Sequence, residues 1–288
     1  MSKYLRSMLG KFVRRIRRFL LVNSLIASTR QRGEADLKKK LELIMPDLSD
    51  QYTSTIMNMN DRYIVEKMRS QHAFQINIAL KTIQYLIDKK KDVINIADIG
   101  DSCGTHITYL KNLLSDLPID IQTLSVNLDK IAIDKIKQKG MNALLCRAED
   151  LSKYNINADI FLSYEMVEHL LNPIDFLRSI SINTDCSYFV ISVPYIRRSR
   201  VGLHYIRNNY KQEVLSEETH IFELCPEDWD LIFQFSGWKV IYSDRYCQYP
   251  SRGLFNIMKY EWRRIDFDGF YGVILTRDHS IMKRYKDW

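Results

Sequence analysis

The chain has 288 residues, of which 46% are apolar and 27% charged, as expected for a globular protein with a full hydrophobic core. Its five cysteines are odd in number and form no Cys-x-x-Cys pair, which argues against a disulfide framework or a zinc knuckle and for a reducing, cytoplasmic location. No stretch approaches the roughly 20 apolar residues that a membrane-spanning helix needs.

The net charge of +7 is unevenly distributed. Residues 1–40 contain twelve Lys and Arg residues against Glu34 and Asp36, a net charge of +10, so the remaining 248 residues carry −3. Nucleic-acid-binding domains usually have a basic surface on the binding domain itself, so this distribution argues against nucleic acid as a partner.

The basic segment predicts an amphipathic helix, which we place at residues 1–28. Within residues 3–22, apolar side chains recur at helical spacing between the basic ones, at Leu5, Leu9, Phe12, Ile16 and Phe19. Such a helix contacts an anionic membrane peripherally, at its inner face, or docks on its own domain or on a second copy of the chain. The sequence leaves these alternatives, and the oligomeric state, open. Residues 29–90 are predicted to form a helical N-terminal extension.

From residue 91 onward, short apolar strands alternate with helices, and we place one α/β domain at residues 91–288. Strands are predicted at residues 93–98, 121–127, 142–146, 159–163, 187–194, 238–244 and 269–277, with helices at 104–116, 129–140, 173–182 and 226–237. This alternation predicts a Rossmann-like, mostly parallel seven-stranded sheet with helices on both faces. Ligands bind such sheets at the carboxyl ends of the strands.

The turn after the first strand reads ADIGDSCGTH and is rich in glycine and acidic residues. Gly100 permits a sharp turn, and Gly104 lets a helix begin close to the strand. A turn of this kind fits NAD, FAD or S-adenosylmethionine. Asp98 and Asp101 would repel a pyrophosphate but not a cationic sulfonium, so the charge favours S-adenosylmethionine as the cofactor.

The sequence here resembles the class I S-adenosylmethionine-dependent methyltransferases. DIGDSCGTH looks like their first motif, and five segments follow in the family's order through about residue 245: SVNLDKIAIDKIKQKG, RAEDL, ADIFLSYEMVEHLLNPIDFL, ISVP and HIFELCPEDWDLIFQFSGWKV. The resemblance implies methyl transfer. It also implies cofactor contacts at Asp98, Gly100, Asp101, Gly104, Asn127, Asp129, Glu149 and Asp150.

Three positions depart from the family's pattern. Ser102 replaces the middle glycine, and Arg147 stands where the family often has Asp, so the adenine contact is expected from the two acidic residues that follow or from a backbone amide. The acidic residue that holds the ribose hydroxyls falls on Asn127, whose amide hydrogen-bonds a hydroxyl more weakly than a carboxylate does. Asp129, two positions later, is the alternative.

The segment SYEMVEHLLNP, at residues 163–173, brings Glu165, Glu168 and His169 to the end of the fourth strand. A near-identical run occurs in the ubiquinone-pathway O-methyltransferases. The small-RNA 3′-end 2′-O-methyltransferases bind Mg²⁺ through a similar ExxEH run and a later histidine, which His220 matches here. The resemblance implies a metal set of these four residues, with His169 and Glu168 catalytic. Alternatively, the glutamates only favour a helix N-terminus.

Residues 195–220 follow the fifth strand and are predicted to form a lid over the acceptor. Arg197, Arg198 and Arg200 would hold an anionic or sugar-like acceptor, and residues 245–264 would form the opposite wall. The sequence as a whole predicts O-methylation of a small molecule or glycan. An RNA 2′-O-methyltransferase, or a non-catalytic membrane-associated adaptor with the same fold, is the alternative.

Overall fold

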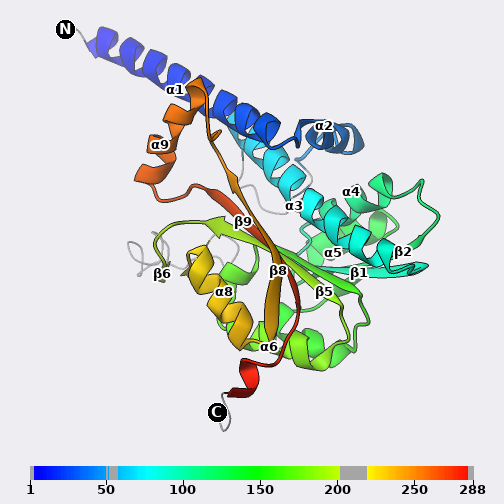
Figure 1. Cartoon of the computed structure of the whole chain (residues 1–288). Helices are drawn as coiled ribbons and strands as arrows, with labels where there is room; N and C mark the ends of the chain where they lie inside the picture. The colour runs from blue at the N-terminus through cyan, green and yellow to red at the C-terminus, as the bar shows by residue number, and fades with distance from the viewer. Residues whose placement is uncertain (1–2, 50, 52–57, 202–218, 285–288) are drawn as a thin grey trace.

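The computed structural model describes residues 3–49, 51, 58–201 and 219–284, and its centre is a seven-stranded sheet (Figure 1). The strands are β1 (Val93–Ile99), β2 (Asp120–Asn127), β3 (Ala143–Leu145), β4 (Ile160–Tyr164), β5 (Tyr188–Tyr195), β8 (Trp238–Cys247) and β9 (Gly269–Arg277). They lie in the order β3-β2-β1-β4-β5-β9-β8, and within this sheet β9 runs antiparallel to both neighbours. Two short strands, β6 (Arg200–Val201) and β7 (Phe222–Glu223), pair separately.

Each strand of the large sheet overlaps a predicted range, which confirms the α/β class and the mostly parallel sheet. Strands β4 and β5 are buried along nearly their whole length because helices cover both faces, so apolar and polar residues do not alternate there. Strand β9 has the same continuous burial although it is antiparallel. Its direction could therefore not be inferred from its own residues.

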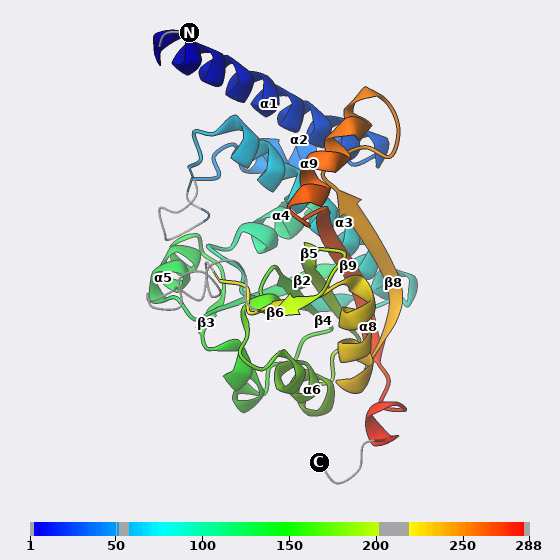
Figure 2. The ribbon, with the colours of Figure 1, turned by 90° about the vertical axis from the view of Figure 1, so that its left-hand side faces the viewer.

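Helices cover both faces of the sheet (Figures 1 and 2). The α-helices are α1 (Lys3–Gln31), α2 (Ala35–Ile44), α3 (Arg62–Asp88), α4 (Thr105–Leu113), α5 (Lys130–Gln138), α6 (Pro173–Asn183), α8 (Pro226–Phe235) and α9 (Lys259–Arg264). The short 3-10 helices are η1 (Ala148–Tyr154), η2 (Val167–His169), η4 (Leu254–Met258) and η5 (Met282–Arg284). Side chains of α3, α4 and α5 join the core on one face, and those of η1, α6 and α8 join the core on the other.

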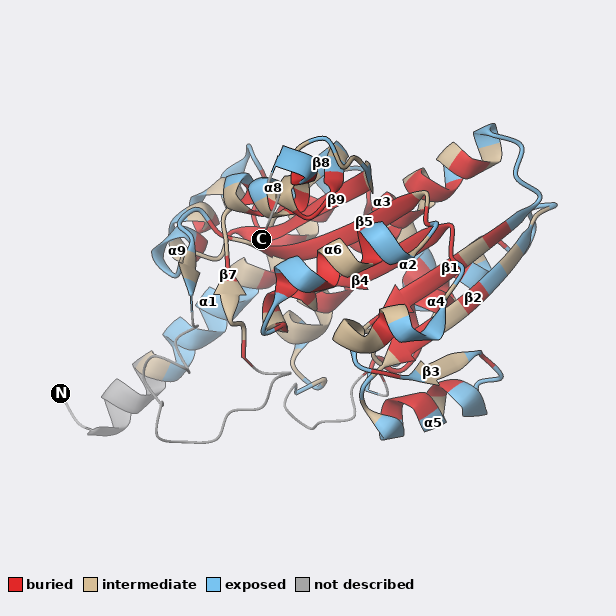
Figure 3. Ribbon diagram, turned by 90° about the horizontal axis from the view of Figure 1, so that it is seen from below, coloured by how far each residue is buried: buried red, intermediate tan, exposed pale blue. Residues whose placement is uncertain are grey.

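The predicted N-terminal extension is not separate from the sheet. Helix α3 lies across one face, where Phe74 and Ile78 pack against β9 and Gln75 Nε2 donates a hydrogen bond to Ser192 Oγ of β5 at 2.9 Å. Helix α1 continues to Gln31, past the expected end at residue 28, and packs on α3. Figure 3 shows buried residues filling the strands and the inner faces of the helices, whereas the described side chains in the outer part of α1 are exposed.

Strands β1 and β4 are adjacent and parallel, so the loops that follow their carboxyl ends lie together at one edge of the sheet. No helix in the described part of the chain has the length and apolar character needed to cross a bilayer.

Replacing Gly272 in β9 by alanine should destabilise the protein by about 1–3 kcal/mol. The new Cβ would lie 2.3 Å from Ile78 Cδ1 and 2.9 Å from Phe74 Cζ, both in the packed interface between α3 and the sheet. Urea unfolding measures the effect. The control is Gly10→Ala, where no atom lies within 4 Å of the added Cβ and the helix should gain stability. A Gly272→Ala protein that unfolds at the wild-type midpoint would contradict this packing.

Candidate active site

The glycine turn between β1 and α4 has the backbone that the sequence predicts. Gly100 and Gly104 have φ angles of +87° and +81°, in the left-handed region that residues with a side chain avoid. A Cβ on Gly100 would lie 2.9 Å from Cγ of Met166, and one on Gly104 would lie 2.5 Å from Cε of Met141. The turn therefore packs directly against the segment that follows β4.

Two carboxyl groups of the turn are fully buried, Asp98 at the end of β1 and Asp101 in the loop. His106 Nδ1 lies 2.9 Å from Asp98 Oδ2, and the His106 backbone N–H donates to Asp101 Oδ1 at 3.2 Å. Ser125 Oγ donates to the other Asp101 oxygen at 2.8 Å. Burial, with the charge of Asp101, raises the pKa of Asp98 to about 7. Burial opposes the charge on His106, but Asp98 outweighs it and the pKa of His106 is raised.

The methionine end of S-adenosylmethionine fits this turn. Asp98 Oδ1 and Thr105 Oγ1 are buried and have no hydrogen-bond partner among the described residues. Buried polar atoms are rarely left unsatisfied, so these two oxygens suit a ligand that carries hydrogen-bond donors, such as an ammonium group. The left-handed glycines leave room for it to approach the backbone.

The ribose end fits less well, because the two side chains predicted to hold the hydroxyls are already engaged. Asn127 Nδ2 donates to the carbonyl oxygens of Asp101 and Ser102 at 3.4 and 3.2 Å, and its Oδ1 accepts from the Asp129 backbone N–H at 2.8 Å. Asp129 Oδ1 caps α5 by accepting from the Ile131 N–H at 2.8 Å. Asn127 thus holds the glycine turn closed.

The predicted adenine contacts lie in η1, directly after β3. Glu149 accepts a hydrogen bond from Arg147 at 3.4 Å, and Asp150 accepts one from Lys153 at 2.6 Å, which lowers the pKa of Asp150. Strand β3 pairs with the end of β2, so η1 begins beside Asn127. Both carboxylates therefore follow the strand that pairs with the end of β2.

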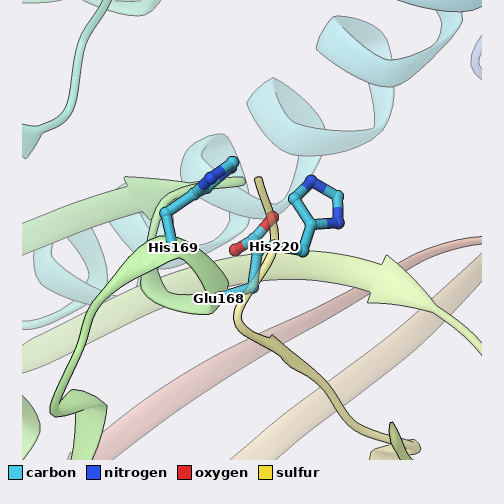
Figure 4. A group of neighbouring side chains, drawn as sticks. All are labelled: Glu168, His169 and His220. Carbon is cyan, nitrogen blue, oxygen red and sulfur yellow. The ribbon is translucent and has the colours of Figure 1, made fainter. Parts of the chain in front are cut away.

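Three of the four predicted metal ligands gather after β4. Figure 4 shows the Glu168 carboxylate between the rings of His169 and His220, and one ligand atom of each residue lies within 4.8 Å of the others. The backbone carbonyl of Glu168 accepts from the Ile221 N–H at 2.9 Å, which brings His220 to the site. The two imidazole rings meet edge to face, with centroids 4.7 Å apart.

Both histidines are oriented through Nδ1. His169 Nδ1 lies 3.1 Å from the Thr219 carbonyl oxygen and His220 Nδ1 lies 3.1 Å from Glu223 Oε1, so each ring, in its neutral form, donates there and has its lone pair on Nε2. Glu168 is fully buried, and neither of its oxygens has a hydrogen-bond partner among the described residues. Burial, with the nearby charge of Glu165, raises the pKa of Glu168 well above its ordinary value.

Glu165 does not join this cluster. Its backbone has φ +51°, a left-handed conformation that is strained for glutamate, and its Oε1 accepts from Ser192 Oγ at 2.9 Å. Burial raises the pKa of Glu165 to about 7, although Ser192 and Lys67 both act against the rise. Of the four predicted metal ligands, Glu168, His169 and His220 therefore lie together, and Glu165 is bound to Ser192 instead.

Two residues beside the candidate site were not predicted from the sequence, Lys67 and His106. Lys67 is half-buried on α3, and its Nζ lies 4.7 Å from the Phe267 ring centroid. Burial lowers the pKa of Lys67, although the charge of Glu165 acts against this. A lysine on the inward face of α3 was the available signal. For His106 the signal was its position two residues after the last glycine of the turn.

Most of the predicted lid, residues 202–218, lies outside the described residues. Arg197 Nε donates to Asp268 at 3.0 Å, and Arg200 pairs with Glu223 and Asp266, so these two guanidinium groups are engaged by protein carboxylates. Arg198 is exposed.

The residues predicted to form the opposite wall, 245–264, pack partly on α1. Tyr246, Tyr249 and Trp262 are buried, and the last two pack in a cluster with Leu20 and Leu21 of α1. Tyr249 Oη also donates to Asp268 at 2.9 Å, the carboxylate that accepts from Arg197.

No protein-family model matches the chain, and no curated protein matches its sequence. Among solved structures, the chain is similar to magnesium protoporphyrin IX methyltransferase from Synechocystis PCC 6803 (9% identity, 83% of this chain and 90% of that chain, TM-score 0.48). It is also similar to 1,6-didemethyltoxoflavin-N1-methyltransferase from Burkholderia thailandensis (12%, 74% and 78%, TM-score 0.48). A third similar structure is a SAM-dependent methyltransferase from Aquifex aeolicus (14%, 67% and 88%, TM-score 0.42).

With identities of 9–14% and TM-scores below 0.5, these similarities assign neither an activity nor a substrate. The fold rests on the described sheet itself. Its seven strands, its helices on both faces and its glycine turn are those that the resemblance to class I methyltransferases implies.

Replacing Glu168 by glutamine should stabilise the metal-free protein at pH 8. The pKa of Glu168 is raised in the folded state, so wild-type stability falls as the pH rises above the ordinary value of 4.5 towards the raised pKa, whereas glutamine does not titrate. We expect a gain of about 1–3 kcal/mol at pH 8, as for relief of an unsatisfied buried group, and little difference near pH 4. Thermal unfolding in EDTA at both pH values measures it, with exposed Glu227→Gln as the control. A less stable Glu168→Gln protein at pH 8 would show that the carboxylate is already stabilised.

Replacing Asn127 by aspartate should not improve the ribose site. The change removes two N–H donors and places a carboxylate against the carbonyl oxygens of Asp101 and Ser102, so we expect a loss of about 1–3 kcal/mol in stability and weaker cofactor binding. Urea unfolding and titration with S-adenosylhomocysteine measure the two effects. Asn112→Asp is the matched control, since Asn112 also donates to a carbonyl oxygen but is exposed. If the variant bound S-adenosylhomocysteine more tightly at unchanged stability, Asn127 would not be needed to hold the glycine turn closed.

Proposed function

We propose that the chain is an S-adenosylmethionine-dependent methyltransferase that methylates a hydroxyl oxygen of a small molecule or glycan. The observation that carries the proposal is the packing of the glycine turn against the segment after β4. Gly100 lies against Met166, two residues before Glu168, whose buried carboxylate has no hydrogen-bond partner among the described residues. A cofactor cradle and a group that handles protons or a cation therefore meet at one edge of the sheet.

Some of the residues would bind the cofactor, and others would act on the acceptor. When bound, S-adenosylmethionine supplies an electrophilic methyl group. Asp98 Oδ1 and Thr105 Oγ1 would accept hydrogen bonds from its ammonium group, and the buried acidic turn would favour its positive charge. His169, with Nδ1 oriented by the Thr219 carbonyl oxygen, would use Nε2 to take the proton of the acceptor hydroxyl.

Alternatively, Glu168, His169 and His220 would hold a divalent cation, with Nε2 of His169 as a ligand instead of a base. The buried Glu168 carboxylate has no hydrogen-bond partner among the described residues, and with two imidazoles oriented through Nδ1 it makes a donor set of one oxygen and two nitrogens. Mg²⁺ prefers oxygen ligands, whereas imidazole suits Zn²⁺, Mn²⁺ or Fe²⁺, so we propose a transition-metal ion in place of the Mg²⁺-like ion expected from the sequence. Such an ion lowers the pKa of a bound hydroxyl. Glu168 would release its proton on binding, so affinity would increase with pH.

The acceptor is best described as uncharged. Arg197 and Arg200 are engaged by carboxylates, and the 248 residues after the N-terminal segment carry a net charge of −3. These features oppose a polyanionic acceptor such as RNA, whose binding depends on neutralising phosphates. A sugar or phenolic hydroxyl fits them better.

A non-catalytic adaptor is the second candidate. The engagement of Asn127 and Asp129 within the turn favours it, since both side chains predicted to hold the ribose are used for structure. Cofactor binding distinguishes the two candidates.

Calorimetric titration of S-adenosylhomocysteine into the full chain tests the proposal. We expect micromolar binding, about 8 kcal/mol, because the methionine end of the site is formed. Separate titrations with Mn²⁺ and Mg²⁺, after EDTA treatment and removal of the chelator, should show binding that is stronger for Mn²⁺ and lost in Glu168→Ala but kept in Glu227→Ala. Failure to bind S-adenosylhomocysteine with or without metal would refute the enzyme and leave the adaptor. Metal binding that survives Glu168→Ala would refute the cation site alone.

A further inference from the structure

Helix α1 has two parts with different surroundings. From Val22 to Thr29, one face is buried against the domain and includes Ser24, Leu25 and Ser28. All of residues 11–19, in contrast, are exposed. Figures 1 and 2 show the N-terminal part of α1 projecting beyond the rest of the molecule. The described side chains of this part therefore lie mostly in solvent.

The projecting part turns its apolar stripe away from the body. At about 100° per residue, the direction of the buried face continues along the basic residues of the outer part, and Arg17 and Arg18 pair with Glu261 and Asp61 of the body. On the other side lie Phe12, Ile16 and Phe19, which are 62%, 44% and 61% exposed. An amphipathic helix that docked on its own domain would face it with the apolar stripe. Here the arrangement is reversed.

A second apolar group lies beside α1. The segment of η4 and α9 packs on α1 through Met258 and Trp262, which contact the cluster around Leu20 and Leu21. Its outer side chains are exposed, with Leu254 at 82%, Ile257 at 62% and Tyr260 at 64%. Arg252, Arg263 and Arg264 are exposed in the same segment. Figure 1 shows both groups at the end of the molecule opposite the C-terminus.

The charge around these apolar side chains indicates what kind of partner binds them. Residues 1–40 have a net charge of +10, and five of the nine exposed residues 11–19 are Lys or Arg. Basic side chains interleaved with Phe, Ile and Leu are suited to the interface of a membrane, where apolar groups enter the acyl boundary and cations attract anionic headgroups. We propose that the outer part of α1, together with η4 and α9, docks the protein on an anionic lipid surface. This inference does not depend on the proposed function.

Vesicle flotation with the full chain tests whether this surface binds anionic lipid. We compare phosphatidylcholine vesicles with vesicles containing about 30% phosphatidylserine, at about 0.1 M salt. The wild type should float with the anionic vesicles and remain unbound with the neutral ones. Phe12→Gln/Phe19→Gln should weaken this binding by about tenfold or more, because two exposed rings no longer enter the bilayer. Leu254→Gln/Ile257→Gln should weaken it as well.

The control is Ile182→Gln/Leu231→Gln, which removes two exposed apolar side chains from α6 and α8, away from this surface, and should float like the wild type. Absence of flotation, or equal flotation of the Phe12→Gln/Phe19→Gln variant, would overturn the proposal. A wild-type dimer that becomes a monomer in that variant would also overturn it, because a second copy would then cover the stripe. Titration of S-adenosylhomocysteine into each variant should match the wild type, so failure of the proposed function remains separate from failure of the surface.

Discussion

The burial of acidic groups at one edge of the sheet is the constraint on which this structure depends. Asp98, Asp101 and Glu168 are fully buried and Glu165 is half-buried, all at the carboxyl ends of β1 and β4 or in the loops that follow. Burying a carboxylate is costly unless it is paired, hydrogen-bonded or protonated. The raised pKa values of Asp98, Glu165 and Glu168 express this cost. Only an arrangement that supplies protons, cations or donors at this edge is stable.

The protein supplies these partners unequally. His106 and Ser125 serve the acidic pair of the glycine turn, while Ser192 serves Glu165, itself receiving a hydrogen bond from Gln75 of α3. Glu168 receives no partner from the described residues. A folded chain retains such a group at the expense of stability, which is typical of residues kept for binding or catalysis. The unsatisfied carboxylate is therefore stronger evidence for a functional site than the presence of the glutamate in a motif.

The sequence predicts the parts of this site that depend on local backbone chemistry. Apolar runs gave the positions of the strands, and the spacing of Gly100 and Gly104 indicated a turn with left-handed residues, which the φ angles confirm. The different surroundings of the Glu165 and Glu168 side chains could not be predicted in this way. Three residues apart, they look equivalent in sequence. The left-handed backbone at Glu165 directs its carboxylate to Ser192, whereas the 3-10 turn at Glu168 places its carboxylate beside the two histidines.

Contacts between distant segments account for the remaining differences. Lys67 lies beside the site but belongs to α3. Asn127, at the end of β2, holds the turn that follows the neighbouring strand β1. Neither role follows from the residues next to it in the sequence. Helix α1 shows the same limit. Its amphipathic period is readable from the sequence, but the orientation of its apolar stripe follows from the inner part of the helix, where Val22, Leu25 and Ser28 are buried against the domain.

Helix α3 connects the proposed active site and the proposed lipid-binding surface physically. Asp61 at its start pairs with Arg18 of α1, while Lys67 and Gln75 further along act on Glu165 and Ser192 beside the site. Because α3 is one continuous helix packed across the sheet, it holds the outer surface of α1 and the edge of the sheet in a fixed relation. A protein bound to a surface through α1 would therefore present the edge that carries Glu168 at a constant orientation to that surface. This requires no conformational change, only the rigidity of a helix that is buried for most of its length.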